Sequence, residues 1–302
     1  MVRFEKVSKR YGKTKALREV SFEVPASQIT AIAGPNGAGK TSAMKIFCGL
    51  SHYEGHVEFL DKELREQGED FRRQRLFYVP EEKGIEPSYR VRDVLLQVDA
   101  LEKQGGKKMD AEKLRQLLHF FGLDRKQNAR MRELSMGTRA TFYLALALSS
   151  TAEILVLDEP LSGLGPVERE FVIRELKSRA MNGGTVFYSS HILEEIEEVA
   201  ERLVVLHNGR VLYQGGIDEA KDRFGEVILE RPARPEALSQ REGVLWTRRS
   251  PGEIYHFFID RQVLKEKLPG KEYSLKLKEI FLYLIEKEKD AVSVTDFVEK
   301  GV

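Results

Sequence analysis

The chain has a single cysteine, Cys48, and no apolar run long enough to cross a bilayer. One cysteine excludes a disulfide within the chain and is typical of a reducing compartment, so we expect Cys48 to be a buried, unreactive thiol. The most apolar segment, Phe142 to Leu148, falls far short of the roughly 20 residues that a transmembrane helix needs. The charged start, Met1 to Lys6, is unlike a signal peptide, and we expect no export signal.

The sequence also lacks an excess of either charge. Its 49 Lys and Arg residues balance 48 Asp and Glu residues, which leaves a formal net charge of +1. No bulk field therefore attracts nucleic acid or anionic lipid, and we expect no nucleic-acid partner. With 302 residues, 41% of them hydrophobic, the chain is long for one average domain. These values predict one large domain with a smaller appendage.

Short apolar runs that end in turn signals alternate with charged, helix-like stretches over the first two thirds of the chain. This alternation predicts an α/β layer in which helices cover a sheet. The expected strands are Ile29–Ala33, Leu76–Val79, Ile154–Leu157 and Thr185–Tyr188. Between about residues 88 and 150 the strand signal stops and a helical insertion is expected, with helices over 91–103, 110–121 and 135–150.

A hairpin signal marks the end of this large domain. Two β-like runs from Leu203 to Tyr213 flank Asn208-Gly209, and Asn-Gly is the strongest short hairpin signal. We therefore predict a core domain over residues 1–216 and a small α+β accessory domain over residues 217–302. In the accessory domain we expect strands at 227–230, 244–246 and 254–259 and a helix from Ser274 to about Lys289.

A glycine-rich segment after the first expected strand fits a phosphate-binding loop. It follows an apolar strand and opens an expected helix from Thr41 to Leu50, as the P-loop mechanism requires. Small residues let successive backbone amides and the helix N-terminus point at one phosphate group. Lys40 would reach the β- and γ-phosphates, and Thr41 would give a hydroxyl oxygen to Mg²⁺. An ordinary glycine-rich turn is the alternative. The expected phosphate-binding residues are Gly34, Pro35, Asn36, Gly37, Ala38, Gly39, Lys40, Thr41 and Ser42.

Two carboxylates end the apolar strand Ile154–Leu157. Their position predicts that Asp158 and Glu159 lie at the carboxyl edge of the sheet, where ligands bind. Asp158 would hold Mg²⁺ through water, and Glu159 would accept a proton from the water that attacks the γ-phosphate. Alone, an Asp-Glu pair is more often a solvated loop, but its combination with the P-loop favours the catalytic interpretation.

The order of four motifs resembles the ATP-binding subunits of ABC transporters. These motifs are the P-loop, Ser135-Met-Gly137, Asp158-Glu159-Pro160 and Ser190-His191. The resemblance implies a P-loop NTPase fold, the ABC cassette, in which a RecA-like α/β core carries an antiparallel β subdomain and a helical signature subdomain. It also implies ATP and Mg²⁺ as ligands, ATP hydrolysis, and a second cassette, identical or different, with ATP sandwiched between the two.

The resemblance assigns further site residues. Ser135 and Gly137 match the signature that meets the partner's γ-phosphate, although Met136 and Thr138 depart from the usual Gly and Gln. Ser135 by itself would more often be a plain helix cap. His191 matches the switch histidine at the γ-phosphate, and Tyr11 matches the aromatic residue that stacks on adenine. Each of these residues would otherwise more often have a structural role.

Two positions depart from the family pattern. Glu81 stands where the family usually has a Gln that ligates Mg²⁺ and senses the membrane partner, and its carboxylate can still ligate the metal. Gly165 stands where an Asp normally communicates across the dimer. This second departure puts coupling between the two ATP sites in doubt.

Weaker similarities indicate the subtype of ABC transporter. The segment Pro80–Gly84, the appendage and the segment Ser274–Leu282 resemble cassettes of bacterial ABC-2 type exporters. That likeness implies a separate transmembrane permease and a cytoplasmic location on the inner face of the cell membrane. A soluble ABC ATPase of translation or DNA repair, and a nucleotide-sensing cassette with little turnover, remain as alternatives.

Overall fold

The computed structural model describes residues 1–81, 86–103 and 109–299, so most of the segment Pro80–Gly84 lies outside the described residues. The chain divides into two compact units, Met1–Val211 and Leu212–Val302. This division falls inside strand β10, Arg210–Gly216, whose last residue is the boundary expected from the sequence. No described helix is long and apolar enough to cross a membrane.

A twisted antiparallel sheet of order β2-β1-β4-β5 opens the first unit. Only the family resemblance implied this sheet, because none of its strands was identified from the pattern of apolar residues. Along β1 and β2 the buried side chains alternate only in part, because the β1–β2 pairing shifts register three times between Phe4 and Arg10. The strands are β1 (Val2–Tyr11), β2 (Thr14–Val24), β4 (Glu54–Phe59) and β5 (Lys62–Glu63).

The second sheet has the order β10-β9-β3-β8-β7-β6, and its pairs from β9 to β6 are parallel. The four expected strands are confirmed, and β3, β7 and β8 are buried along their whole length. The expected hairpin is also present, with Asn208 and Gly209 both in the left-handed region. The strands are β3 (Ile29–Ala33), β6 (Leu76–Val79), β7 (Ile154–Leu157), β8 (Thr185–Ser190), β9 (Arg202–His207) and β10.

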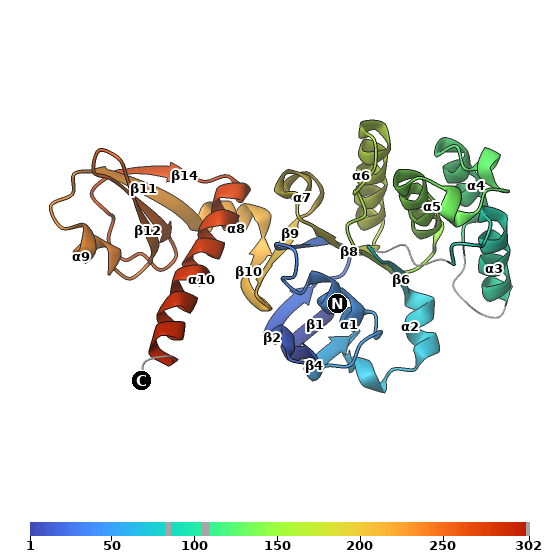
Figure 1. Cartoon of the computed structure of the whole chain (residues 1–302), viewed down its shortest axis with the longest axis horizontal. Coiled ribbons are helices and arrows are strands. Elements are labelled where there is room, and N and C mark those ends of the chain that lie inside the picture. The colour runs from blue at the N-terminus through green and yellow to red at the C-terminus, as the bar shows by residue number, and fades with distance from the viewer. Residues whose placement is uncertain (82–85, 104–108, 300–302) are drawn as a thin grey trace. The chain divides into compact units, whose positions relative to one another are not determined.

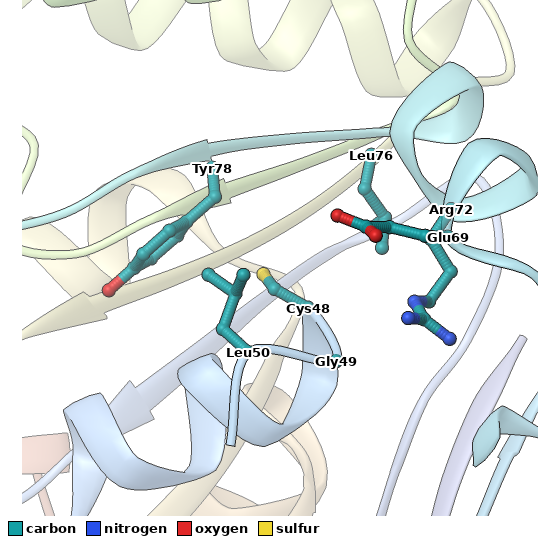
Figure 2. Close-up of a pocket in the computed structure, with 7 residues that line it drawn as sticks. All are labelled: Cys48, Gly49, Leu50, Glu69, Arg72, Leu76 and Tyr78. Carbon is teal, nitrogen blue, oxygen red and sulfur yellow. The ribbon is translucent and has the colours of Figure 1, made fainter.

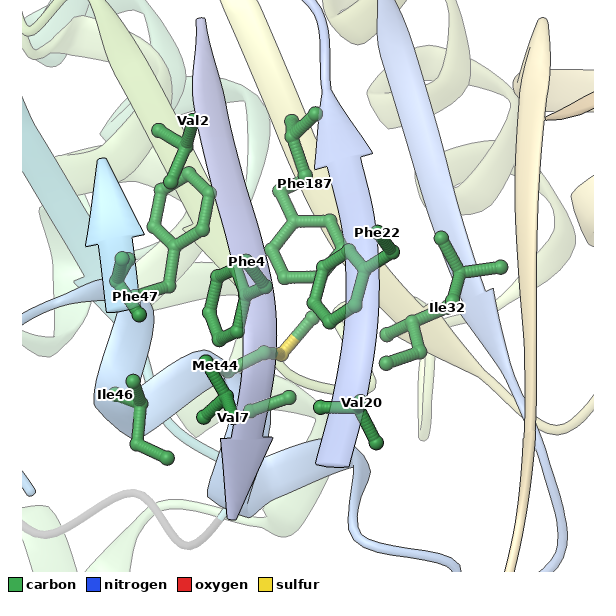
Figure 3. Packing of buried hydrophobic residues seen from close by; sticks show 14 of the residues in the cluster. Val2, Phe4, Val7, Val20, Phe22, Ile32, Met44, Ile46, Phe47 and Phe187 are labelled. Carbon is green, nitrogen blue, oxygen red and sulfur yellow. The ribbon is translucent and has the colours of Figure 1, made fainter. Parts of the chain in front are cut away.

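An aromatic core joins the two sheets through helix α1 (Figure 3). Phe4 of β1 stacks on Phe22 of β2 with ring centroids 4.3 Å apart, and Phe47 of α1 stacks on Phe187 of β8 at 5.1 Å. All four rings are buried. Burial of such rings stabilises by about 1.5–3 kcal/mol each, so this cluster fixes α1 and its preceding loop against the parallel sheet.

Helices cover the parallel sheet, and α3, α4 and α5 lie together in the first unit (Figure 1). The three expected helices of this region are confirmed within one residue at each end. The expected helix after the P-loop is shorter than predicted and ends at Phe47, because Gly49 adopts a left-handed conformation that closes it. The helices are α1 (Lys40–Phe47), α2 (Glu69–Arg75), α3 (Val91–Lys103), α4 (Ala111–Phe120), α5 (Met136–Ser149), α6 (Pro166–Met181) and α7 (Leu193–Val199).

The second unit is an antiparallel sheet of order β12-β13-β11-β14 with helix α10 (Leu277–Glu299). Three strands and the helix were expected. Strand β14 (Lys271–Ser274) was missed because all four of its residues are exposed and carry no alternating pattern, so the helix begins later than Ser274. The other elements are α8 (Ile217–Arg223), β11 (Phe224–Glu230), α9 (Pro235–Ser239), β12 (Val244–Ser250) and β13 (Ile254–Asp260).

Cys48 is only half-buried, which corrects the expectation of a buried thiol. It caps the short helix α1 and borders a hollow of about 430 Å³ between α1, α2 and β6 (Figure 2). The hollow is lined by Cys48, Gly49, Leu50, Glu69, Arg72, Leu76 and Tyr78. The early end of α1 therefore places the sulfur at the rim of the core.

Candidate functional site

The expected phosphate-binding loop connects β3 to α1, and its glycines are required by close backbone contacts. A Cβ on Gly34 would lie 2.2 Å from the Leu206 carbonyl oxygen, and one on Gly39 would lie 2.5 Å from that of Ala16. Gly39 also has a φ of +110° and directly precedes the first residue of α1. The loop is tied to the β9–β10 turn, because Gly209 N donates to Ala38 O at 3.0 Å. Pro35, Asn36 and Gly37 remain exposed.

Lys40 lies over this loop. Its side chain is 8% exposed, and Nζ donates to the carbonyl oxygen of Gly34 at 2.8 Å and approaches that of Pro35 at 3.4 Å. The same Nζ is 3.9 Å from Oε1 of Glu159. The ammonium therefore stands between the loop backbone and a carboxylate, within reach of an anion that the loop amides could hold.

Asp158 is fully buried beyond the end of β7 and has two hydroxyl partners. Thr41 Oγ1 donates to its Oδ2 at 2.7 Å, and Ser189 Oγ donates to its Oδ1 at 2.5 Å. Its backbone N–H donates to Val79 O on the neighbouring strand β6 at 2.8 Å. Thr41 and Asp158 thus present hydroxyl and carboxylate oxygens to one point, a donor set that suits Mg²⁺.

Ser189 was not identified from the sequence, although it was visible there. In the parallel pair β7–β8, Leu157 lies opposite Tyr188, so the next residues, Asp158 and Ser189, are neighbours. The serine hydroxyl also accepts from Glu159 N at 2.9 Å. Ser189 therefore fixes both carboxylate residues of the β7 edge.

Glu159 and His191 form a hydrogen-bonded pair. His191 Nδ1 is 2.9 Å from Glu159 Oε2. The Glu159 side chain is 9% exposed and that of His191 is 56% exposed, so the pair lies at the border between core and solvent. Glu159 has a φ of +49°, an unfavourable backbone for a residue with a side chain, which is typical of functional sites.

Tyr11 ends β1 and lies near the start of α1. Burial tends to raise the pKa of its phenol, but hydrogen bonds to Ser51 and Ser42 and the charge of Lys9 lower the pKa below its usual value. The ring is 49% exposed, with Lys9 Nζ 4.8 Å from its centroid. Tyr11 is thus a half-exposed aromatic residue beside Ser42 at the P-loop helix, with Lys9 over its ring.

Ser135 and Gly137 begin α5 outside this cluster. Ser135 is exposed and caps the helix, with Oγ accepting from Thr138 N at 3.2 Å. A Cβ on Gly137 would lie 2.5 Å from the Gly163 carbonyl oxygen, so glycine permits this close approach. Neither residue has a hydrogen bond or ion pair to Lys40 or Asp158 within the described part of the chain.

The two residues that depart from the family pattern have different surroundings. Glu81 follows β6 at the carboxyl edge of the sheet and is exposed. Gly165 is the N-cap of α6, and a Cβ there would lie 2.5 Å from Oε2 of Glu168. The Glu168 carboxylate therefore lies next to the position from which an aspartate side chain would extend.

Comparison with known proteins identifies the family of the chain. Residues 17–162 match the ABC transporter family. The chain is 32% identical to an uncharacterized ABC transporter ATP-binding protein, YhaQ, of Bacillus subtilis (strain 168), covering 83% of this chain and 84% of that protein. It is 31% identical to Nod factor export ATP-binding protein I of Burkholderia orbicola (strain AU 1054), covering 94% of this chain and 97% of that one.

Solved structures agree on the fold. The ATP-binding subunit of an ABC transporter superimposes with a TM-score of 0.66 at 25% identity, over 74% of this chain and 92% of that one. A dimeric ATP-binding cassette in a post-hydrolysis state with ADP and Pi gives a TM-score of 0.62 at 23% identity, over 72% of this chain and 98% of that one. The chain belongs to the ATP-binding subunits of ABC transporters, a family of ATPases.

Proposed function

We propose that this chain uses Mg²⁺ to hydrolyse ATP and drives export through a separate transmembrane permease. The main support is the convergence of Lys40, Thr41, Asp158, Glu159 and His191 at one edge of the parallel sheet. These residues come from three separate segments of the chain. Their convergence unites a phosphate-binding loop, a set of oxygen donors for a metal and a paired acid and imidazole.

The phosphate and metal roles follow from the donor types. Loop amides and Lys40 bind the β- and γ-phosphates of ATP, with the lysine exchanging its carbonyl partners for phosphate oxygens. Thr41 and Asp158 would hold Mg²⁺, and Glu81 at the same sheet edge would supply a further oxygen. Bound Mg²⁺ neutralises charge that develops on the phosphates. Ser189 keeps Asp158 oriented.

The hydrolytic role falls to Glu159 and His191. Glu159 accepts a proton from the attacking water as its oxygen approaches the γ-phosphate. His191, hydrogen-bonded to Glu159 through Nδ1, orients that carboxylate and the water. The near exclusion of Glu159 from solvent favours this function, because its carboxylate has few competing water partners.

Two cassettes are needed to complete each ATP site. Ser135 and Gly137 begin an exposed helix end and make no polar contact with the P-loop cluster in the described part of their own chain. We therefore assign them to the γ-phosphate of ATP bound by a partner cassette, and Tyr11 to the adenine ring. A solved cassette of similar fold is dimeric, which supports this assembly.

The proposal that the chain drives export through a permease is based on its similarity to named relatives. One relative that covers nearly the whole chain is named as a Nod factor export ATP-binding protein. We propose that this chain likewise works on the inner face of the cell membrane and belongs to the ABC-2 type. Residues 1–216 form the motor cassette and residues 217–302 form an accessory domain.

Steady-state ATPase activity of the purified chain with Mg²⁺ tests this proposal. Turnover should rise cooperatively with protein concentration, because two chains form each site. Glu159→Gln and Lys40→Ala should each lower kcat by about 100-fold or more. Turnover that survives in Glu159→Gln would disprove the base assignment, whereas ATP binding without turnover in the unaltered chain would favour a nucleotide sensor.

A further inference from the structure

Glu195 is a buried carboxylate to which the proposed reaction gives no role. It lies on α7, where the other acidic side chains of the helix are exposed and Glu195 is 7% exposed. Removal of a carboxylate from water is unfavourable unless partners replace the water. The partners of Glu195 therefore indicate what the residue does.

The first partner is the residue that precedes His191. Ser190 Oγ donates to Glu195 Oε2 at 3.1 Å, and the same hydroxyl accepts from Ile192 N at 3.0 Å. The residues on both sides of His191 are thus joined through one buried hydroxyl, and that hydroxyl is joined to α7. The Glu195 contact thus ties the turn between β8 and α7 to the start of α7.

The second partner comes from α6. Nη1 of Arg169 makes a close ion pair with Glu195 Oε1. Arg169 N in turn donates to Gly165 O at 2.9 Å, at the start of α6. Glu195 therefore connects the turn that carries His191 to the segment that follows Glu159.

His191 is weakly held by the residues that the structure describes. Its side chain is 56% exposed, and the polar contact that these residues give it is the 2.9 Å hydrogen bond to Glu159. Nearby Tyr188 is deeply buried, and burial together with the charges of Glu195 and Glu159 raises the pKa of its phenol. Because the imidazole of His191 is exposed, its orientation depends mainly on the backbone that carries it. The Ser190 hydroxyl holds that backbone through its bonds to Glu195 and Ile192 N.

We propose that Glu195 and Arg169 are positioning residues that hold His191 in hydrogen-bonding register with Glu159 through Ser190. This inference rests on the proposed hydrolytic function of the Glu159–His191 pair. Neither Glu195 nor Arg169 touches the reacting groups in this arrangement. Their effect on the reaction is carried by the position of the imidazole.

Kinetics of the full chain gives the first test. Glu195→Gln keeps the shape and an acceptor for Ser190 but removes the charge that faces Arg169, and Ser190→Ala removes the hydroxyl alone. Both should lower kcat by about 10-fold or more, since small misplacements of catalytic groups have effects of that order. KM for ATP should stay within about twofold, because the P-loop is untouched.

Glu175→Gln is the control, since it breaks an ion pair of α6 with Lys113 away from His191.

A readout independent of turnover separates this inference from the proposed function. The ring nitrogens of His191, assigned among the six histidines with His191→Gln, report its hydrogen bond by ¹⁵N NMR. We expect Glu195→Gln and Ser190→Ala to change these signals and Glu175→Gln to leave them unaltered. Unchanged His191 signals in both variants would overturn the inference even if ATPase activity fell.

Two further outcomes are also decisive. An unaltered chain without ATPase activity, but with His191 signals that depend on Glu195, would refute the hydrolytic function and support the positioning role. If Glu195→Gln does not fold, the double change Arg169→Met and Glu195→Met replaces the buried pair with apolar side chains, which proteins often tolerate. A folded double variant with unaltered His191 signals would overturn the inference.

Discussion

Ser189 Oγ donates a 2.5 Å hydrogen bond to Asp158 Oδ1 while accepting from the backbone N–H of Glu159. One hydroxyl on β8 thus orders the two consecutive acidic residues that follow β7. We propose that Asp158 binds the metal and that Glu159 acts in hydrolysis. Because Ser189 orients both residues, we expect it to affect both functions.

Replacement of this serine should therefore damage both stability and turnover. Ser189→Ala leaves a buried carboxylate oxygen and a backbone N–H without their partner, which should cost about 1–3 kcal/mol of unfolding free energy. We also expect a lower kcat and a higher Mg²⁺ requirement, measured by ATPase titration with the metal. Ser178→Ala on the exposed face of α6 is the matched control, and an equal loss there would argue against a specific role.

The close backbone contact at Gly34 predicts intolerance of any side chain. In Gly34→Ala the Cβ would meet the Leu206 carbonyl oxygen at 2.2 Å, so the P-loop must move away from β9. We expect ATP affinity, measured by fluorescent-nucleotide titration, to fall by at least about tenfold because the amides lose their alignment. Gly68→Ala has open space around it and should bind ATP normally. Normal ATP binding by Gly34→Ala would show that the loop tolerates the displacement.

The aromatic core predicts a large effect of one ring on the first unit. Phe4→Ala removes a buried ring that stacks on Phe22, and such truncations cost about 3–5 kcal/mol. Chemical denaturation followed by far-ultraviolet circular dichroism measures the loss. Leu50→Ala, at a side chain that is 64% exposed, should change stability by less than about 0.5 kcal/mol. Similar losses in the two variants would contradict the assigned core.

The raised pKa of Tyr283 predicts that the stability of the second unit depends on pH. Burial, followed by its hydrogen bond to Glu226 and the charge of that carboxylate, raises the pKa of its phenol well above the usual value. The folded unit therefore binds this proton more tightly than the unfolded chain does. The resulting stability is complete below the ordinary tyrosine pKa of about 10 and is lost as the pH rises above it.

The fluorescence of Trp246 can report unfolding near Tyr283. Trp246 is the only tryptophan of the sequence, and the centroid of its ring lies 5.4 Å from that of Tyr283. Denaturation followed by Trp246 fluorescence should give a lower unfolding free energy at pH 11 than at pH 8. Tyr283→Phe should reduce this difference, since it removes the titrating hydroxyl. A difference of unchanged size in Tyr283→Phe would assign the titration to other groups.

Local signals in the sequence were sufficient for much of the fold. The buried strands β3, β6, β7 and β8 were found because each is a short apolar run with a turn signal after it. The edge strand β14 was not found, because a solvated strand carries no apolar pattern and is defined only by its pairing with β11. The end of α1 was misplaced because the effect of Gly49 depends on its left-handed backbone.

The residue types of the site and their order can be read from the sequence, because P-loop chemistry and carboxylates at a strand end depend on local spacing. Three contacts appear only in the folded chain: Ser189 with Asp158, His191 with Glu159, and Arg169 with Glu195. These contacts join segments that are distant along the chain. They arise from the register of parallel strands and the packing of α6 and α7, which no local pattern encodes.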